Sequence, residues 1–408
     1  MIEWSEQHLM IRDAFQRFVE EEIKPNQEAL EHGDLPPYDI LRKMYATFGM
    51  DELARTRFEK QIAAEKAGKS RSEARAEGRK GDGGGSAMMM IPIIELCRYC
   101  PGMVTAMGVS VGLTAGAILS KGTIAQKEKW ALPILTLDKI GAWAITEPGS
   151  GSDAFGGMKA TAKRDGDGYV LNGNKTFITN GPYADTTVFI CKLEEEGVAP
   201  ADRKMVSFIL DKGMPGFEQT RPMRKMGMHS SPTGELFCQD VKVGRDRLIG
   251  ESEQKASGKS GAKDTFSTER SGVAAMALGI IEQCLEYCVK YAKERISFGK
   301  PIGEYQLIQL KLAKMEVARM NVQNLIFRQI EMSEQGKQMT FAEASAMKLY
   351  SAQVCTDVCL EAVQLFGGNG YMSEFGVEQL CRDAKVLQIY GGTDEIQVTH
   401  IARDLLKE

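Results

Sequence analysis

Side chains that could carry electrons or bind a metal are present but scattered. Cys97 and Cys100 form a C-x-x-C pair, yet no second pair follows at zinc spacing and no βαβ pattern surrounds it. Other cysteines are paired at i,i+4 spacing within helical stretches: Cys284/Cys288 and Cys355/Cys359. We interpret all of these as core thiols. The four histidines suggest neither a metal site nor a Ser-His triad: His8, His32, His229 and His400. Redox chemistry would therefore need an organic cofactor.

The stretch GSGSDA at 149–154 fits the dinucleotide pattern G-x-G-x-x-A. Pro148 precedes it, two further glycines follow it, and the next predicted elements are strands rather than a helix. We therefore reject a Rossmann fold. Its backbone N–H groups could still bind an anion or the edge of a cofactor.

Residues 387–397, LQIYGGTDEIQ, form a third candidate. Gly391 and Gly392 follow an aromatic residue and precede the expected start of a helix. Thr393 can cap that helix, with Glu395 in its first turn. The stretch predicts a glycine loop that leads into a C-terminal helix.

Bulk composition describes an ordinary globular protein. The 408 residues are 43% hydrophobic and 26% charged, and the net charge is −4. This length predicts two or three domains. The charge balance favours neither nucleic acid nor an anionic membrane as a partner. Nine cysteines do not suggest a secreted disulfide scaffold.

The first residues predict an amphipathic helix rather than a targeting signal. A secretory signal needs an uninterrupted apolar core, and a transit peptide is poor in acid, whereas Glu20, Glu21 and Glu22 stand together here. We expect a cytoplasmic protein from a bacterium.

Residues 101–120 carry no charge, and Gly108, Gly112 and Gly116 form a small-xxx-small ladder. A transmembrane dimer helix is one interpretation. The alternative, which we favour, is a buried helix that neighbours approach closely, because Pro101-Gly102 shortens it below a full span.

Hydrophobic periodicity divides the chain into three domains. Residues 1–138 predict an N-terminal α-helical domain, interrupted at 55–87 by a polar insertion whose end should be mobile; a basic interaction patch is the alternative there. Residues 139–250 predict a β domain, with Asn172-Gly173 as the turn of a hairpin. A polar linker at 251–264 precedes a helical bundle at 265–408. The fold class is mainly α with a central β domain, an α+β architecture.

Three helices are predicted in the bundle, at Phe266–Ile296, Tyr305–Glu334 and Thr340–Phe366. Their lengths and short connections are compatible with antiparallel packing.

Five stretches together resemble the acyl-CoA dehydrogenase family, in its order and at similar spacing. They are WAITEPGSGSD (143–153), NGNKTFITNG (172–181), RISFGKPI (295–302), QLFGGNGY (364–371) and CRDAKVLQIYGGT (381–393). The resemblance covers most of the chain from about residue 90 onward, plus the N-terminal helices.

The resemblance implies FAD held between a helical domain, a β domain and a C-terminal four-helix bundle. It implies a homotetramer, a dimer of dimers, in which a neighbouring subunit holds part of each FAD. The implied reaction is α,β-dehydrogenation of an acyl-CoA thioester. A carboxylate removes the α-proton, hydride passes from the β-carbon to flavin N5, and an electron-transferring flavoprotein takes the electrons.

By the same resemblance, sixteen residues are expected to bind FAD: Trp143, Ile145, Thr146, Gly151, Ser152, Phe177, Ile178, Thr179, Arg295, Phe298, Gln306, Gln364, Gly367, Gly368, Thr393 and Glu395. Phe177 stands where the family usually has Trp. Arg295 is expected to pair with an FAD phosphate. Seven residues are expected at the substrate: Ser152, Ser267, Arg270, Tyr390, Gly391, Gly392 and Arg403.

The catalytic carboxylate is missing from its usual place in the family, because Gly391 stands there. Some members, including the long-chain and isovaleryl types, have Gly in the loop and Glu on a bundle helix. FSTERSGV at 266–273 matches that helix, with Glu269 at the alternative position. We therefore expect Glu269 to be the base. An ordinary acid in a first helical turn is the alternative.

Two other functions stay open. The chain could be a catalytically weak partner subunit or binding protein that retains the fold, although Glu269 argues against this. It could also pass electrons to oxygen, although it lacks the long C-terminal extension of many acyl-CoA oxidases. The polar stretches at 55–87 and after Gly250 depart from the family near the expected acyl and CoA entrance.

Overall fold

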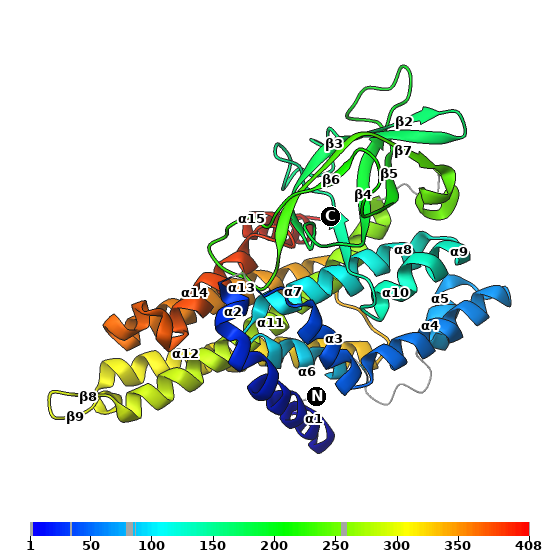
Figure 1. Ribbon diagram of the computed structural model, residues 1–408. Coiled ribbons are helices and arrows are strands. Elements are labelled where there is room, and N and C mark those ends of the chain that lie inside the picture. The colour runs from blue at the N-terminus through cyan, green and yellow to red at the C-terminus, as the bar shows by residue number, and fades with distance from the viewer. Residues whose placement is uncertain (1–2, 33–34, 79–84, 86, 254–258, 408) are drawn as a thin grey trace.

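The computed structural model describes residues 3–32, 35–78, 85, 87–253 and 259–407, and for residues 259–269 it describes the backbone alone. Helices come first, then a sheet, then long helices (Figure 1). The predicted fold class, mainly α with a central β domain, is confirmed. The exact domain limits stay a prediction.

Ten helices are described before the sheet: α1 (Glu6–Phe18), α2 (Gln27–Glu31), α3 (Tyr38–Thr47), α4 (Met50–Lys66), α5 (Arg71–Gly78), α6 (Ala87–Leu96), α7 (Pro101–Met107), α8 (Gly116–Lys121), α9 (Ile124–Gln126) and α10 (Leu132–Leu135). Two of them, α4 and α5, occupy most of the expected polar insertion. Their Ala, Glu, Lys and Arg residues favour helix. Glu65 on α4 bonds the buried ammonium of Lys127 at 2.6 Å and 2.7 Å, which anchors the stretch. The part expected to be mobile falls on 79–84 and 86, outside the described residues.

The uncharged stretch forms one continuous helical path through α7, a π-helical segment at Gly108–Ala115 and α8. By length and composition, this helix and the one at Arg270–Glu294 could each cross a membrane, but 50% and 67% of their apolar windows are buried inside the protein. Core helices of globular proteins share those properties. In the described part of the chain, no heavy atom outside the helix's own backbone lies within 4 Å of a Cβ built at Gly108, Gly112 or Gly116. The expectation that these glycines permit close helix packing is therefore wrong.

The sheet contains β1 (Gly141–Ala144), β2 (Thr161–Asp165), β3 (Gly168–Thr179), β4 (Thr186–Leu193), β5 (Met205–Asp211), β6 (Phe217–Gln219) and β7 (Thr233–Gly244). Its order is β1-β4-β2-β3-β7-β6, and β5 pairs with β4. Every residue of β4 is buried, and this strand pairs with β1, β2 and β5. The sheet has its own apolar core, which includes Phe189, Phe208 and Leu236.

The hairpin predicted at Asn172-Gly173 is wrong, because both residues lie inside the continuous strand β3. They form an irregularity opposite β7, where the register shifts between Leu171 and Gly173. The Asn172 amide group exchanges two hydrogen bonds with Asp240. Gly173 has a φ of +140°, and an added Cβ would lie 2.5 Å from that of Ala160. Asn-Gly favours this site for the same reason that it favours turns, which is tolerance of unusual backbone conformations.

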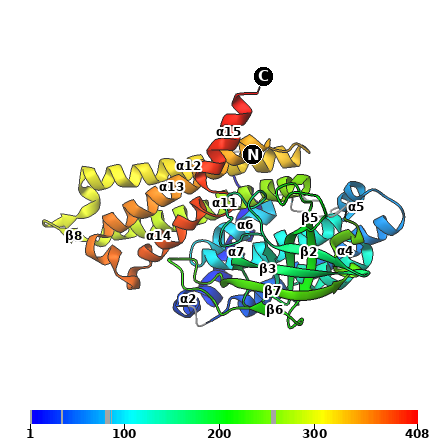
Figure 2. The same ribbon diagram turned by 90° about the horizontal axis from the view of Figure 1, so that it is seen from above.

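The C-terminal part contains α11 (Lys259–Glu294), β8 (Ile296–Ser297), β9 (Lys300–Pro301), α12 (Gln306–Glu334), α13 (Phe341–Phe366), α14 (Val377–Lys385) and α15 (Asp394–Leu405). The three long helices run side by side (Figure 2), and the limits of α12 and α13 lie within one residue of the predicted ones. Helix α11 begins inside the stretch expected to be a linker. Eight of the nine cysteines are buried and Cys381 is partly so, as expected of core thiols.

A buried acid pair joins all three parts of the molecule. Glu31 on α2 is 5% exposed and Asp383 on α14 is fully buried. From the β domain, Ser230 contacts the Glu31 carboxyl at 3.5 Å, and the backbone N–H of Met228 donates to Asp383. Burial, reinforced by Asp383, raises the pKa of Glu31 from its ordinary value of 4.5 to about 8.

This raised pKa predicts a pH-dependent stability. Because folded Glu31 binds its proton more tightly than unfolded Glu31, its contribution is complete below pH 4.5 and is lost as pH rises toward 8. We expect the free energy of unfolding, measured by urea denaturation, to fall across this window by up to about 1.4 kcal/mol per pH unit from this group. Glu31→Gln should remove that part of the slope. Identical slopes for the two proteins would contradict the assignment.

Helices α6 and α11 approach closely at Gly279, where an added Cβ would lie 2.1 Å from the carbonyl oxygen of Ile94. We expect Gly279→Ala to destabilise the protein by about 1–3 kcal/mol in chemical denaturation. Gly272→Ala is the matched control, because the helix is the same and, among the described side chains and the backbone of other elements, no atom lies within 4 Å of a Cβ there. It should stabilise by about 0.5–1 kcal/mol through helix propensity. Equal effects would show that the contact at Gly279 carries no constraint.

Candidate functional site

Expected cofactor residues from the β domain gather where β1 ends beside a kink in β3. Trp143 is on β1, and Thr146, just beyond it, accepts a hydrogen bond from the backbone N–H of Thr176 at 2.9 Å. The register of β3 against β7 shifts between Lys175 and Ile178. Phe177 at this kink has a φ of +58° and a side chain that is 65% exposed. A strained backbone that presents an aromatic ring to the outside is typical of a ligand site.

A buried ion pair supports this edge of the sheet from behind. The side chain of Lys175 is fully buried, and its ammonium donates to Glu147 at 2.9 Å and to the carbonyl of Ile145 at 3.1 Å. Glu147 also accepts the backbone N–H groups of Lys159 and Ala160. Burial lowers the pKa of Lys175, and Glu147 opposes that shift. The pair therefore joins three segments. They are the residues just after β1, the strand β3, and the residues that lead from the GSGSDA loop into β2.

That loop is open and contains no helix, so rejection of a Rossmann fold is confirmed. Ser152 is exposed, and among the described residues no atom beyond the adjacent ones lies within 4 Å of a Cβ built at Gly149 or Gly151. Thr179 and Ile178 continue the same edge, half-buried and buried respectively. Exposed hydroxyls, open glycine backbone and an exposed aromatic ring fit a flat cofactor such as a flavin.

The glycine loop adopts left-handed backbone at both positions, with φ of +62° at Gly391 and +88° at Gly392. Two buried side chains hold its carbonyl groups. The ammonium of Lys348 donates to the carbonyl of Gly392 at 2.9 Å, and the Gln397 amide donates to the carbonyls of Gly391 and Gly392 at 3.0 Å and 2.9 Å. Thr393 caps α15 by accepting from the backbone N–H of Ile396, as predicted. Glu395 lies in the first turn of that helix.

The substrate residues expected on α11 and α15 lie in different surroundings. Ser267 and Glu269 belong to the part of α11 whose side chains lie outside the description. Arg270 is 2% exposed, with its guanidinium 3.9 Å above the ring of Phe341. It donates to Ser345 at 2.9 Å and contacts Nδ1 of His400 at 3.2 Å. Arg403 is exposed further along α15.

A second group of expected cofactor residues lies apart from the first. Arg295 follows the end of α11, 26 residues after Glu269, so helix geometry separates their backbones by about 39 Å at 1.5 Å per residue. Phe298, between β8 and β9, is 98% exposed, at the end of the bundle remote from the sheet (Figures 1 and 2). Exposed side chains or open backbone also occur at the others: Gln306, Gln364, Gly367 and Gly368. One chain does not bring the two groups together.

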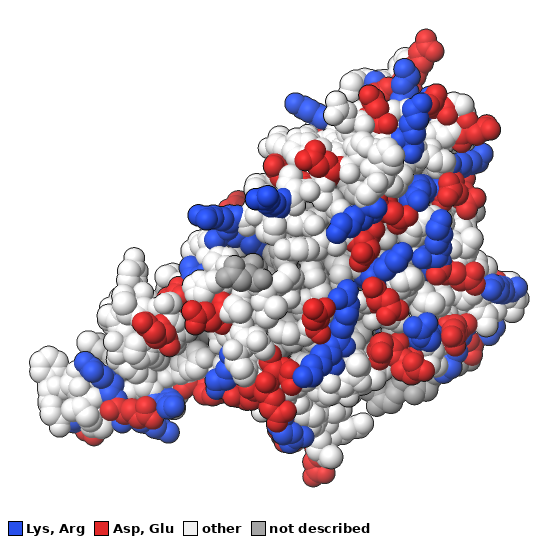
Figure 3. Space-filling model, in the orientation of Figure 1, with Lys and Arg blue, Asp and Glu red and all other residues white. Residues whose placement is uncertain are grey.

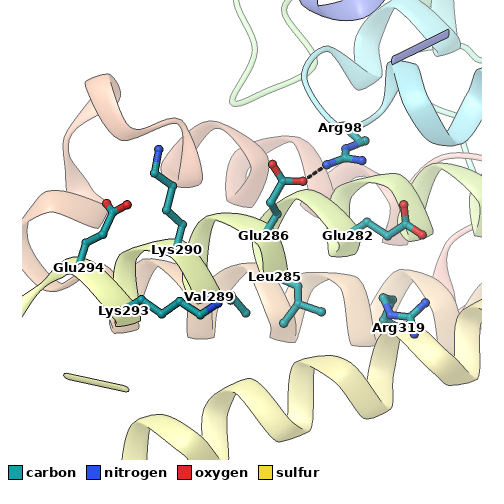
Figure 4. A pocket seen from close by; sticks show the side chains of 9 residues that line it. All are labelled: Arg98, Glu282, Leu285, Glu286, Val289, Lys290, Lys293, Glu294 and Arg319. Carbon is teal, nitrogen blue, oxygen red and sulfur yellow. Dashed lines mark hydrogen bonds and ion pairs between the residues drawn. The ribbon is translucent and has the colours of Figure 1, made fainter. Parts of the chain in front are cut away.

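A pocket of about 490 Å³ opens on the outer side of α11 and coincides with neither group (Figure 4). It is lined by Arg98, Glu282, Leu285, Glu286, Val289, Lys290, Lys293, Glu294 and Arg319. Arg98 pairs with Glu286, and Glu282 bonds Arg12 at 2.6 Å. Charges of both signs are likewise interspersed over the face seen in Figure 3. We interpret the pocket as a water-filled surface groove lined by ion pairs, and not as the cofactor or substrate site.

Sequence reasoning missed the buried polar residues that hold the site. Lys348 stands between apolar neighbours in a helix pattern, SAMKLY, and Lys175 stands in a strand pattern, NKTFIT, two residues before Phe177. A charged residue in a predicted core position is the signal that could have identified them, because such a group must be paired.

Comparison with known proteins gives consistent matches along the chain. Family models for the acyl-CoA dehydrogenase N-terminal, middle and C-terminal domains match residues 74–138, 142–241 and 256–406. A short-chain specific acyl-CoA dehydrogenase from Megasphaera elsdenii is 39% identical over 331 residues, 81% of this chain and 85% of that protein. The caffeyl-CoA reductase-Etf complex subunit CarC of Acetobacterium woodii is 35% identical over 407 residues, 99% of this chain and 100% of that protein. Butyryl-CoA dehydrogenase from Megasphaera elsdenii superposes with a TM-score of 0.84, at 33% identity and full coverage of both chains.

The ion pair behind the β-domain edge yields a stability prediction. Glu147→Gln leaves the buried ammonium of Lys175 without a counter-charge, so we expect a loss of about 3–5 kcal/mol in the free energy of unfolding, measured in urea. The double variant Glu147→Gln/Lys175→Met removes both charges and should recover much of that loss. A double variant as unstable as the single one would mean that the backbone hydrogen bonds of Glu147, rather than its charge, matter.

Proposed function

Since this chain belongs to the acyl-CoA dehydrogenase family, and is an FAD-dependent oxidoreductase, we propose that it converts an acyl-CoA thioester to the trans-2-enoyl-CoA. The observation that carries the proposal is the pairing of a glycine loop at 391–392 with an acid at position 269 of α11. Arg270, the neighbour of that acid, is held by the same two helices, α13 and α15, that hold the loop.

The proposed base is Glu269, which takes the α-proton of the thioester. The side-chain-free backbone at Gly391 leaves room for a carboxylate that arrives from α11 instead of from the loop. When bound, FAD supplies the acceptor for the hydride of the β-carbon, at flavin N5. Substrate contacts are proposed for Ser152, Ser267, Arg270, Tyr390 and Arg403, besides the glycine loop, although burial of Arg270 favours a role in holding α11.

FAD is proposed to lie against the edge formed by Trp143, Thr146 and Phe177, beside the exposed GSGSDA loop. Hydroxyl and backbone donors there would favour the negative charge that a reduced flavin gains. Ile145, Gly151, Ser152, Ile178 and Thr179 complete this half, together with Thr393 and Glu395.

The remote group, which includes Arg295 and Phe298, is proposed to complete the FAD site of a neighbouring subunit. The rise of about 39 Å from Glu269 to Arg295 along α11 supports this, because it places Arg295 far from the proposed base at which the flavin must react. We propose a homotetramer, a dimer of dimers. Phe298 and Leu307, exposed by 98% and 75% at that end, would then be covered.

An electron-transferring flavoprotein is the proposed electron acceptor, and the named Etf complex of the Acetobacterium woodii relative supports it. A cytoplasmic role in bacterial fatty-acid β-oxidation is proposed with it. Because that relative is named a reductase, the panel of saturated acyl-CoAs, varied in length and branching, should also include ones with an aromatic tail. A 2-enoyl-CoA, which cannot reduce the flavin, is tested instead for re-oxidation of the reduced protein.

The test is anaerobic bleaching of the flavin of the purified protein by that panel. We expect Glu269→Gln to retain FAD but to lose bleaching by at least about 100-fold, because the amide cannot accept the α-proton. Glu269→Asp, which keeps a carboxylate on a shorter arm, should retain part of the rate.

Undiminished bleaching by Glu269→Gln would move the base to another residue. A wild-type protein that is colourless and cannot be reconstituted with FAD would favour the alternative, a partner subunit or binding protein that retains the fold.

A further inference from the structure

Helices α13 and α15 each contact both halves of the proposed catalytic site. On α13, Ser345 accepts from Arg270 at 2.9 Å, and Lys348, three residues later, donates to Gly392 at 2.9 Å. On α15, Gln397 donates to the glycine loop, and His400, three residues later, contacts Arg270 at 3.2 Å. Residues three apart on a helix lie on one face, so each helix presents two polar groups in the same direction.

The direction of each hydrogen bond is determined by chemistry. A guanidinium can only donate, so Ser345 Oγ and His400 Nδ1 must both accept from Arg270. Lys348 likewise can only donate, and it also lies 3.3 Å from the carboxylate of Asp394 in the first turn of α15. The contacts are therefore specific to these residue types.

Burial makes the arrangement rigid. Ser345, Lys348 and Gln397 are 0% exposed, and Arg270 is 2% exposed. A buried polar group that loses its partner pays the full cost of desolvation, so alternative positions of the loop or of α11 are disfavoured.

We propose that Ser345, Lys348, Gln397 and His400 form a register clamp that sets the position of Glu269 relative to the loop at Gly391–Gly392. The clamp residues are positioning residues, since they contact Arg270 and the loop backbone and act on the substrate through them. The inference rests on the proposed function. To that function the clamp adds that α13 and α15 fix the distance between the base, Glu269 on α11, and the substrate α-carbon beside the glycine loop.

The experiment compares Lys348→Met, Ser345→Ala and the double variant with the wild-type holoenzyme. The readout is the single-turnover rate of anaerobic flavin bleaching, with acyl-CoA deuterated at either the α- or the β-carbon. We expect each single variant to slow bleaching roughly 10- to 100-fold, because small misplacement of a reacting group is costly. The isotope effect of the α-deuterium should rise relative to that of the β-deuterium, since proton removal is the step that suffers.

Ser351→Ala is the matched control. Ser351 is a fully buried serine on α13, three residues beyond Lys348, and its hydroxyl has no hydrogen-bond partner in the described part of the chain. It should bleach at the wild-type rate. The two arms of the clamp are also expected to be coupled, so that the double variant is less impaired than the product of the two single effects.

Three outcomes would overturn the clamp. The first is a wild-type bleaching rate in both single variants. The second is a loss of rate that is fully explained by a smaller content of FAD or of folded protein. The third is an unchanged ratio of the two isotope effects. Should Lys348→Met not fold, Ser345→Ala carries the test. A wild-type protein that no acyl-CoA bleaches would instead refute the proposed function, so the two failures are distinguishable.

Discussion

The packing of α11 is the constraint on which the rest of the molecule depends. This helix of 36 residues contacts N-terminal helices, α12, α13 and α14. Its backbone approaches α6 so closely at Gly279 that no side chain fits there. Because a helix has a fixed rise per residue, its contacts with these several helices together fix the positions of both of its ends. One end carries the proposed base, and the other leads into Arg295 and the remote cofactor group.

Buried charges determine the exact positions of backbone segments that apolar packing alone would not fix. Apolar packing is nondirectional and tolerates small shifts, whereas a buried ammonium requires acceptors at defined positions. Lys175 in the β domain and Lys348 in the bundle both meet this requirement with a carboxylate and a backbone carbonyl. In each case the carbonyl belongs to a segment that is expected to contact cofactor or substrate. Fixed polar contacts behind a site thus hold flexible backbone in one conformation.

Much of the architecture follows from local patterns. The long bundle helices have strong periodicity, and their limits agree with prediction to within a few residues for α12 and α13. The cap at Thr393 follows from local chemistry in the same way. By contrast, Asn172-Gly173 and the Gly108–Gly116 ladder were misjudged. Both patterns permit several structures, and the choice depends on which distant segment lies opposite.

The sequence by itself determined the element types and the family resemblance, because periodicity and motif order are local properties of the chain. The pairing of Gly391 with Glu269 is a prediction from the same motifs. The sequence also predicts which residues face a cofactor. Only the tertiary structure decided that Arg270 is buried, that Lys348 and Gln397 hold the glycine loop, and that the segment of β8 and β9 lies at the end of the bundle remote from the sheet. These features involve segments that are far apart in the chain. They depend on how the helices pack against one another, whereas the helices themselves form because of their local sequence.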